Sequence, residues 1–444
     1  MTRRRRSDTV WMIVMLVISG NPAVYPLAGG EENLLPIVAA VLGFAVVARR
    51  ARVFQPRVLW VTAALVGIQL VQCYEFQFWP VVTILGMVTR LFIAAAVVAL
   101  VEDFPAVYVR AITIVATYCL AMWVLDQTAL ALRLDFRGLF APIEQAIGLH
   151  ADHRFALVYT FSILHGSYRN AGFFREPGLF AGYLLLGLLW LMLDRRGVAP
   201  RASSLGASPQ GDSDPSCAAD RDRAITARVR RRRIVVVLAA LLTTFSTAGY
   251  VTIPVVLAAV AFEHGERIKR VVSRKAMFVA VLVVSLGGLW LVSKNTTFLE
   301  DKIQSQYEEV VDETANYETA RFGAALLDLE AIEERPYLGW GLHESTKFAE
   351  IPEFAQLSPS GGVTGWARSF GIVGVVVFLL AIWAGLRPLV SGSLAASIYA
   401  TAAIAVIAQP NTFLNYPTFL ALMFLRRPPE RHDQVVAGPE RART

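Results

Sequence analysis

Charged residues are scarce in this sequence of 444 residues, in which Asp, Glu, Lys and Arg together make up only 17%. Soluble globular chains usually carry about 25% charged residues and about 45–50% apolar residues. Here the apolar share is 55% and the mean hydropathy is +0.50. The shortage of charge argues against a soluble domain over any large part of the chain.

Several motifs that carry common chemistries are also missing. The sequence has no Walker A motif, no GxGxxG after a predicted strand and no HExxH, which argues against a nucleotide-driven pump and a membrane zinc protease. Its 3 cysteines show neither an even number nor a zinc-ligand spacing. We therefore expect no disulfide framework, no metal site and no cofactor.

The positive charge does not indicate a nucleic-acid partner. A net charge of +7 and a pI near 9.4 would suggest nucleic-acid binding in a soluble protein. Here the basic residues stand at the ends of apolar blocks, where they report the orientation of membrane helices. The partner that they indicate is the lipid bilayer.

What the sequence does contain is a series of apolar blocks, each near the length of about 20 residues that a spanning helix needs. The blocks predict an all-α fold, a polytopic membrane protein with about 12 transmembrane helices that forms a single membrane domain over residues 1–444. One long block covers residues 234–262. The other spans are predicted near residues 10–27, 34–48, 58–73, 80–101, 106–125, 177–193, 276–293, 366–386, 394–409 and 412–425.

Lys and Arg counts in the connections assign the sides of the membrane. Basic runs occur near residues 3–6, 49–57, 195–233, 267–275 and 426–431. These segments, and hence both termini, are predicted to be cytoplasmic. We expect a disordered cytoplasmic loop over 194–233, a disordered tail over 427–444, and outer loops over 126–176 and 294–365.

The block 234–262 has cytoplasmic flanks on both sides, so it must cross an even number of times or re-enter. It is too short for two full crossings, which need about 40 residues. We expect two short helices broken at Phe245–Gly249, where the Ser-Thr-x-Gly composition suits a break that faces protein or water. One long tilted helix is the alternative.

The second outer loop contains a predicted amphipathic helix over Asn316–Glu334. Phe322, Leu326, Leu329 and Ile332 follow one another at helical spacing there. Pro336 and the following Gly-rich GWG are expected to end it.

Arginine occurs at two kinds of unusual place. Arg90 lies in the middle of the span 80–101, where a charge usually faces the interior and marks a site, although an internal ion pair or snorkelling would also explain it. Arg169 and Arg175 precede the span that begins at Pro177, on the predicted outer face, where arginines are uncommon.

These arginines point to a phosphate-rich ligand. Guanidinium groups match phosphate oxygens bidentately, so an outer cluster of Arg169, Arg175, Arg321 and Arg90 would suit a pyrophosphate headgroup. Glu176 stands beside Arg175 and is a candidate general base. Capping of the next helix, or a salt bridge to Arg175, would explain Glu176 equally well.

Three stretches, in this order and on these predicted sides, resemble the O-antigen polymerase/ligase superfamily. RNAGFFREPGLFAGYLL is similar to the family's arginine-containing approach to a helix, and its Glu-Pro form resembles exopolysaccharide and O-antigen polymerases. LLTTFSTAGYVTI is similar to the family's serine-containing turn between two short helices. ETARFGAALLDLEAIEERPYLGWGL is similar to its arginine and PxxGxG stretch in the large outer loop. GVTGWARSFGIVGVVVFLL then resembles its return into the membrane.

The resemblance implies glycosyl transfer at the outer face, without a metal or a nucleotide sugar, from a polyprenyl-pyrophosphate-linked glycan. A chain-length regulator or a flippase would be partner proteins. It implies catalytic roles for Arg175, Arg321 and Glu176, and it adds Ser246 and His343 to the substrate-binding residues. Arg169 and Arg90 complete that binding set.

The resemblance also bears on the class of reaction. Ligases typically carry a histidine before the last group of spans, whereas SPSGGVTGW here has none and His343 is the nearest. Where many members have Ser-Arg in the turn, this chain has Ser246-Thr247. A polymerase of lipid-linked repeat units is therefore favoured over an O-antigen ligase. A membrane transporter of lipids or glycans, or a structural or regulatory membrane protein, is the competing reading.

Overall fold

The computed structural model describes residues 3–21, 24, 30–140, 142, 154–156, 159–161, 168–193, 215–268, 321–347, 362–390 and 394–426. The described part is mostly helical and contains one small antiparallel hairpin. Its helices are α1 (Arg3–Ile18), α3 (Glu31–Ala48), α4 (Pro56–Phe76), α5 (Val81–Leu100), α6 (Phe104–Ala131), α8 (Pro177–Leu193), α9 (Pro215–Thr243), α10 (Thr247–Ile268), α13 (Arg321–Glu334), α14 (Glu344–Lys347), α15 (Gly362–Leu386), α16 (Leu394–Ala408) and α17 (Pro417–Leu420). The short 3-10 turns are η1 (Arg137–Phe140), η3 (Phe413–Asn415) and η4 (Ala421–Phe424), and the hairpin pairs β1 (Arg154–Ala156) with β2 (Tyr159–Phe161).

Among the described helices, α4, α5, α6 and α15 are long and apolar enough to cross a membrane. Large apolar side chains are exposed on the outer helices, as Phe44 on α3 (79% exposed) and Val82 on α5 (75% exposed) illustrate. Extended exposed apolar surface is rare on soluble monomers, because water disfavours it. The fold is therefore that of a membrane-embedded helical protein.

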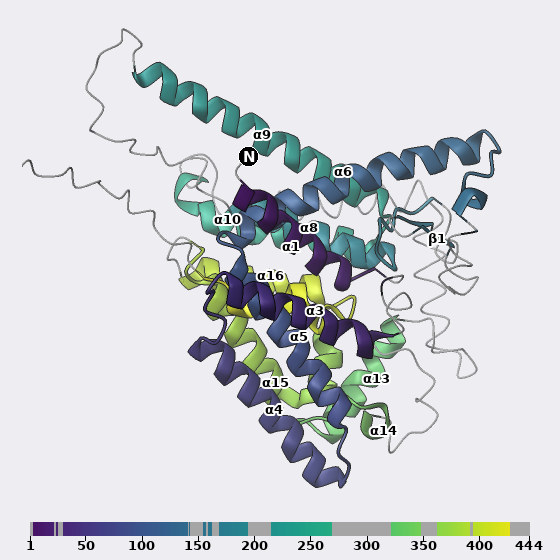
Figure 1. The fold of residues 1–444 in the computed structure, drawn as a ribbon, viewed down its shortest axis with the longest axis vertical. Helices are drawn as coiled ribbons and strands as arrows, with labels where there is room; N and C mark the ends of the chain where they lie inside the picture. Colours follow the sequence, from purple (N-terminus) through teal and green to yellow (C-terminus); the bar gives the residue numbers. More distant parts are fainter. Residues whose placement is uncertain are drawn as a thin grey trace, which may run out of the picture.

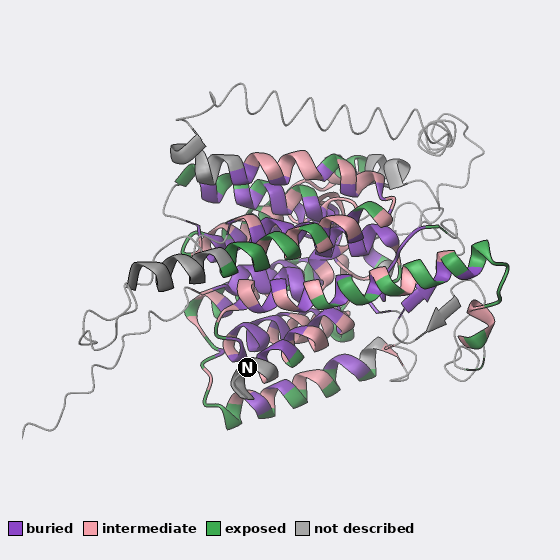
Figure 2. Ribbon diagram, turned by 90° about the horizontal axis from the view of Figure 1, so that it is seen from above, coloured by how far each residue is buried: buried purple, intermediate pink, exposed green. Residues whose placement is uncertain are grey.

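Helix α8 lies at the centre of the described fold. It packs against α6, α9, α10 and α16, and nearly all of its residues are buried. Figure 2 shows the buried residues concentrated among the inner helices and the exposed ones on the outer helices. A helix that is apolar all round is stable only inside such a bundle.

Different segments of the chain lie at the two ends of the helical bundle. Figure 1 shows the N-terminus and the start of α9 towards the left of the view, and β1, α13 and α14 towards the right. Segments that the charge pattern assigns to opposite sides of a membrane thus lie at opposite ends of the bundle. Which end faces the cytoplasm stays a prediction.

A break in the block 234–262 is confirmed, but it lies at residues 244–246 rather than over the whole predicted stretch Phe245–Gly249. Helix α9 ends at Thr243 and α10 begins at Thr247, so a single long helix over this block is excluded. The predicted helix over Asn316–Glu334 is confirmed from Arg321 onward as α13, and it ends just before Pro336.

Three sequence predictions were wrong. Residues 215–233 form the first part of α9 rather than a disordered loop, because this stretch is rich in Ala and Arg, which favour helix. The span predicted over 10–27 ends as a helix at Ile18, where Ser19-Gly20-Asn21 interrupts it. The span predicted over 412–425 consists instead of η3, α17 and η4, since the residue before Pro417 is extended and breaks the helix.

Parts of other predictions fall outside the described residues. These are the span 276–293, residues 141, 143–153, 157–158 and 162–167 of the outer loop 126–176, residues 294–320 and 348–361 of the outer loop 294–365, the loop segment 194–214 and the tail 427–444. In loop 126–176 the described parts are the end of α6, η1, the hairpin and the approach to α8.

Candidate functional site

The segment that leads into α8 packs directly on the break between α9 and α10. The Arg169 side chain is 8% exposed, and its Nε donates to the Thr244 carbonyl at 3.2 Å. The Asn170 backbone N–H donates to the Thr243 carbonyl at 2.9 Å. We call this contact, residues 168–172 on residues 243–246, the loop–break junction. It joins two of the stretches that the sequence singled out, although some 70 residues separate them in the chain.

Asn170, which was not predicted as a site residue from the sequence, holds the junction together. Its amide donates to the Thr243 hydroxyl at 2.9 Å, and its Oδ1 accepts from the Gly172 backbone N–H at 2.9 Å. The Tyr159 hydroxyl lies 3.5 Å from the same Oδ1. A fully buried amide needs such partners. The signal in the sequence was a polar residue directly before an apolar run.

The break itself has a strained turn and a capped helix. Phe245 has a φ of 45°, in the left-handed region that non-glycine residues rarely adopt. The Ser246 hydroxyl, which is buried, accepts from the Gly249 N–H at 3.2 Å and thereby caps α10. Ser246 therefore has a structural role here, and its contact with a substrate stays a prediction.

Arg175 and Glu176 stand at the first turn of α8. The Arg175 side chain is exposed and that of Glu176 is half-buried. The Arg175 N–H donates to the Gly20 carbonyl at 3.0 Å, so the end of α1 fixes the start of α8. The exposed guanidinium is available to a ligand at this end of the bundle. Arg169 and Ser246 thus lie at the loop–break junction, and Arg175 and Glu176 follow Arg169 in the segment that leads into α8.

The other predicted arginines are not brought to this region by the described contacts. Arg90 is half-buried within α5, which packs mainly against α3, α17, η4, α4 and α1. Arg321 is the first residue of α13, and its side chain lies outside the described residues. Their part in a pyrophosphate site stays a prediction.

The PxxGxG stretch has a clear structural partner, a break inside α15. Residues 336–341 run along residues 368–373, where Gly371 is non-helical. Four backbone hydrogen bonds join the two segments: Trp340 N–H to Arg368 carbonyl (2.8 Å), Gly341 N–H to Ser369 carbonyl (2.9 Å), Ile372 N–H to Pro336 carbonyl (2.7 Å) and Val373 N–H to Tyr337 carbonyl (3.2 Å). We call α13 and residues 335–341, packed on residues 368–373, the α13–α15 clasp.

The glycines of the clasp are required by its geometry. Gly339 has a φ of +71°, and a Cβ there would lie 2.4 Å from the Arg368 carbonyl oxygen. Gly371 has a φ of +64°, and a Cβ there would lie 2.1 Å from the Tyr337 carbonyl oxygen. Both contacts are with backbone, which cannot rotate away. The spacing of the motif therefore has a physical reason that is independent of any family.

A buried ion pair also holds the clasp. Arg368 of α15 lies 3.0 Å from the carboxylate of Asp328 on α13, and their side chains are 8% and 0% exposed. Burial raises the pKa of the Asp328 carboxyl to about 6, while the charge of Arg368 and a hydrogen bond from Thr364 oppose that increase. The pair fixes α13 across the end of the bundle.

This ion pair was not predicted from the sequence, and the buried face of α13 differs from the predicted apolar face. Asp328 is fully buried, whereas Leu329, predicted to lie on the apolar face, is 49% exposed. Arg368 lies within an apolar span, and the rule that marked Arg90 would have marked it too. Its partner could not be found in this way, because the pairing is made only in the tertiary structure.

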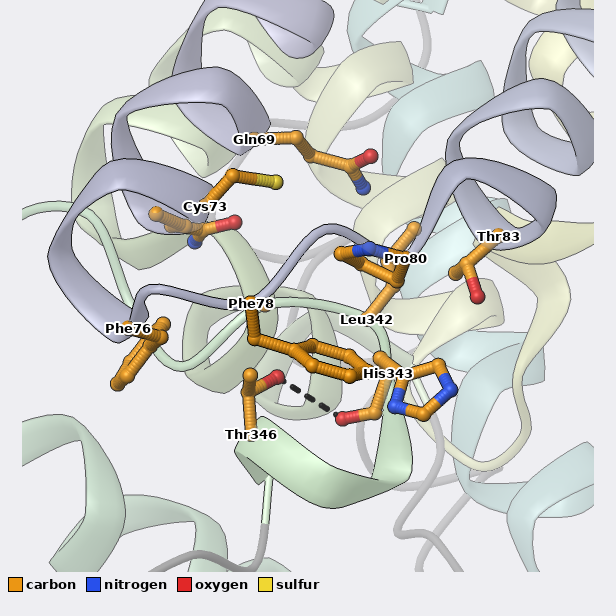
Figure 3. Close-up of a pocket in the computed structure, with 11 residues that line it drawn as sticks. Gln69, Cys73, Phe76, Phe78, Pro80, Thr83, Leu342, His343 and Thr346 are labelled. Atoms are coloured by element: carbon orange, nitrogen blue, oxygen red, sulfur yellow. Dashed lines mark hydrogen bonds between the residues drawn. The ribbon is translucent and has the colours of Figure 1, made fainter.

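His343 lies beside the clasp, away from the loop–break junction. Its ring centroid is 4.8 Å from that of Phe78, in the connection between α4 and α5. Its Nδ1 accepts from the Ser345 N–H at 3.2 Å, and its carbonyl accepts from the Thr346 hydroxyl at 3.0 Å. His343 lines a small hollow, which Figure 3 shows.

Within the described residues, no group of three or more His, Cys, Asp and Glu side chains is arranged to hold a metal ion. No protein-family model matches this chain, and no curated protein is significantly similar to it in sequence.

Proposed function

We propose that this protein is a membrane glycosyltransferase, a polymerase that joins polyprenyl-pyrophosphate-linked oligosaccharide repeat units. It would work at the outer face of the bacterial inner membrane, in O-antigen or exopolysaccharide biosynthesis. The proposal includes about 12 membrane crossings with both termini in the cytoplasm. The resemblance of the three sequence stretches motivates it, and the loop–break junction is the observation that supports it best.

The loop–break junction supplies arginine side chains at the end of an apolar bundle, and a lipid-linked donor needs such positive charge for its pyrophosphate. Arg169 is held in place by the Thr244 carbonyl, and Arg175 projects from the start of the same helix entrance. A polyprenyl chain would lie along the apolar outer surface, which would bring its pyrophosphate to the level of these helix ends. Fixed positive charge there would stabilise the negative charge that develops on the departing pyrophosphate.

The proposed step exchanges one bond for another. The hydroxyl of one lipid-linked repeat attacks the anomeric carbon of the other, whose bond to the pyrophosphate oxygen breaks. Polyprenyl pyrophosphate leaves with the bonding electrons, and the hydroxyl proton passes to a base. Glu176, half-buried beside Arg175, is the carboxylate proposed for that role.

Arginine substitutions test the clamp. Arg175→Ala should abolish polymer formation, and Arg175→Lys should restore it only in part, because lysine keeps the charge but loses the bidentate fork. Arg52→Ala is the matched control, since Arg52 is an exposed arginine in the connection between α3 and α4. Immunoblots should show equal membrane levels of all variants. Full polymer length in the Arg175→Ala strain would refute the clamp.

A ligase is the second candidate, and one observation favours it. His343 presents an imidazole beside the clasp, where a base could serve transfer to lipid A core. If His343→Ala stops transfer to core while long lipid-linked polymer accumulates, the ligase replaces the polymerase. If single repeats remain trapped on the cytoplasmic face when the protein is lost, the transporter reading replaces both.

A further inference from the structure

Two arginines from distant parts of the chain meet at the end of the bundle where α3 ends and α4 begins. Arg57, at the start of α4, donates from Nη1 to the Leu425 carbonyl at 3.2 Å, across 368 positions of the sequence. Arg426 donates in turn to the Arg52 carbonyl. Because each side chain reaches the backbone beside the other, the two guanidinium groups converge. We call Arg57 and Arg426 the arginine pair.

The arginine pair lacks the acidic partner that charged groups away from water usually have. Both side chains are half-buried, and within the described residues neither forms an ion pair with a carboxylate. Arg49, at the end of α3, shows the contrast, because it lies 3.3 Å from the carboxylate of Asp8. The sequence has no Asp or Glu between residues 33 and 74 or between residues 354 and 429. The segments that carry the pair therefore supply no counter-charge of their own.

Convergence of two like charges without a counter-charge is unfavourable. Burial lowers the pKa of Arg426, and the positive charge of Arg57 lowers it further, so the two groups repel each other. The side-chain oxygen of Gln55 accepts from Arg426 in one orientation of its amide, but it brings no negative charge. An anion bound by both guanidinium groups would remove the repulsion.

The arginine pair is open to an occupant. Nε and Nη2 of Arg57 have no partner among the described residues, yet they are not among the buried polar atoms that lack one. These N–H groups therefore face the surface of the protein. A guanidinium fork matches the oxygens of a phosphate group bidentately. Since Arg426 stands beside this fork, one phosphate can contact both side chains.

The surface beside the arginine pair is apolar, which points to a lipid rather than a soluble anion. Phe54, Leu59 and Trp60 are all exposed there. Residues three apart lie on one face of a helix, so Trp60 continues the face of Arg57 towards the middle of α4. Tryptophan is enriched where a membrane meets water. Basic pockets between membrane helices bind the headgroups of anionic lipids.

The tendency of cytoplasmic connections to be basic does not by itself require this arrangement. That tendency concerns the number of Lys and Arg residues in a connection. Arg50 and Arg52, both exposed between α3 and α4, already contribute to it. It does not call for half-buried arginines that are bonded to a segment near the other end of the chain.

We propose that the arginine pair binds the phosphate of an anionic membrane phospholipid, whose acyl chains lie along Leu59 and Trp60. The lipid would supply the missing negative charge and join the segment after η4 to the start of α4. This site is separate from the proposed pyrophosphate clamp. The connection that carries Arg57 contacts Asp8 near the start of α1, whereas Arg175 contacts Gly20 beyond its end. The inference does not rest on the proposed function.

Native mass spectrometry of the full chain, released from detergent micelles, counts the bound lipids and gives their affinity. The probes are phosphatidylglycerol and phosphatidylcholine with identical acyl chains. Arg57→Gln and Arg426→Gln each remove one charge but keep an amide donor. Arg50→Gln is the matched control, because it removes one charge from an exposed side chain in the connection before α4.

One phosphatidylglycerol is expected to bind saturably to the wild type and the control. Its affinity should be about tenfold weaker in each variant of the arginine pair, a loss of about 1.4 kcal/mol. Lysine at either position should recover part of the affinity, because it keeps the charge but loses the fork. Phosphatidylglycerol with brominated acyl chains should quench tryptophan fluorescence more in the wild type than in Trp60→Phe, which locates the chains.

Three results would overturn the lipid site. One is affinity for phosphatidylglycerol within twofold of wild type in both glutamine variants. Another is equal retention of phosphatidylcholine, which would show that the headgroup charge is not recognised. The third is displacement of phosphatidylglycerol by millimolar inorganic phosphate, which would assign the pair to a soluble anion. If the glutamine variants fail to accumulate, quenching of the wild type decides, and equal quenching by the two brominated lipids rejects the site.

Discussion

Replacement of Gly371 by alanine should open the α13–α15 clasp while leaving the bundle intact. At a φ of +64° and a ψ of −174°, Gly371 occupies a region that is almost exclusive to glycine. The new Cβ would lie 2.1 Å from the Tyr337 carbonyl oxygen and 2.5 Å from the Leu338 nitrogen. No rotamer change relieves these contacts, so the two segments must separate.

The size of the effect follows from the backbone strain and from the hydrogen bonds that break. The backbone strain amounts to about 1–3 kcal/mol. Separation also breaks the hydrogen bonds donated by Ile372 and Val373, each worth about 1 kcal/mol. The clasp should therefore be destabilised by about 3–5 kcal/mol, which raises the fraction of open molecules by at least about 100-fold.

Amide hydrogen exchange, followed by mass spectrometry in nanodiscs, reports this opening at the N–H groups of Trp340, Gly341, Ile372 and Val373. Gly67→Ala is the matched control, because Gly67 lies inside α4 with no atom within 4 Å of the added Cβ. That variant should be neutral or slightly stabilised. Exchange within twofold of wild type in Gly371→Ala would refute the steric argument.

Two further predictions concern the buried polar groups. Asn170→Ala should destabilise the loop–break junction by about 2–3 kcal/mol. A double-mutant cycle with Thr243→Val should give a coupling energy of about 1 kcal/mol, because the two side chains share a hydrogen bond. Additive effects of the two substitutions would contradict that contact. The second prediction is that the stability of the α13–α15 clasp depends on pH. Because the folded-state pKa of Asp328 is raised from 3.8 to about 6, the folded state binds this proton more tightly than the unfolded state. The resulting stability is fully present below about pH 4 and lost as the pH rises through about 6. Exchange in α13 should follow that profile, and Asp328→Asn should flatten it; an unchanged profile in the variant would exclude Asp328 as its source.

The positions of most helices could be predicted from hydrophobic blocks alone. The helices α3, α4, α5, α6, α8, α15 and α16 lie close to the predicted spans. The break before Thr247 was also predictable, because the loop charges forced an even number of crossings over a block too short for two. Local composition carries this information, since apolar length and Lys/Arg placement depend on membrane physics more than on partners.

What the sequence could not reveal are contacts between distant segments. Asp328 looks like one acid among several on an amphipathic helix, and only the approach of Arg368 makes it a buried partner. Asn170 likewise becomes a junction residue only because Thr243 stands against it. The stretch 412–425 is apolar enough for a span, but its Asn and Pro residues break it into turns that other helices bury.

The site residues likewise divide into those that sequence motifs predicted and those that only the tertiary structure reveals. Arg169 and Ser246 were selected from separate motifs, and the structure brings both to the loop–break junction. His343 was selected as the nearest histidine to a motif, and it lies instead at a hollow whose main polar feature, Gln69, no motif marked. The lining of such a hollow is set only when distant segments pack together, so no sequence pattern announces it.

Glycan analysis of a strain that lacks this protein tests the central proposal most directly. A polymerase joins exported lipid-linked repeats, so its loss should leave single repeats that still reach the outer face and, where a ligase is present, become attached to lipid A core. Long polymer stranded on polyprenyl pyrophosphate would contradict the polymerase and indicate a ligase. We predict single repeats with no polymer ladder, restored to full length by the wild-type chain and not by Arg175→Ala.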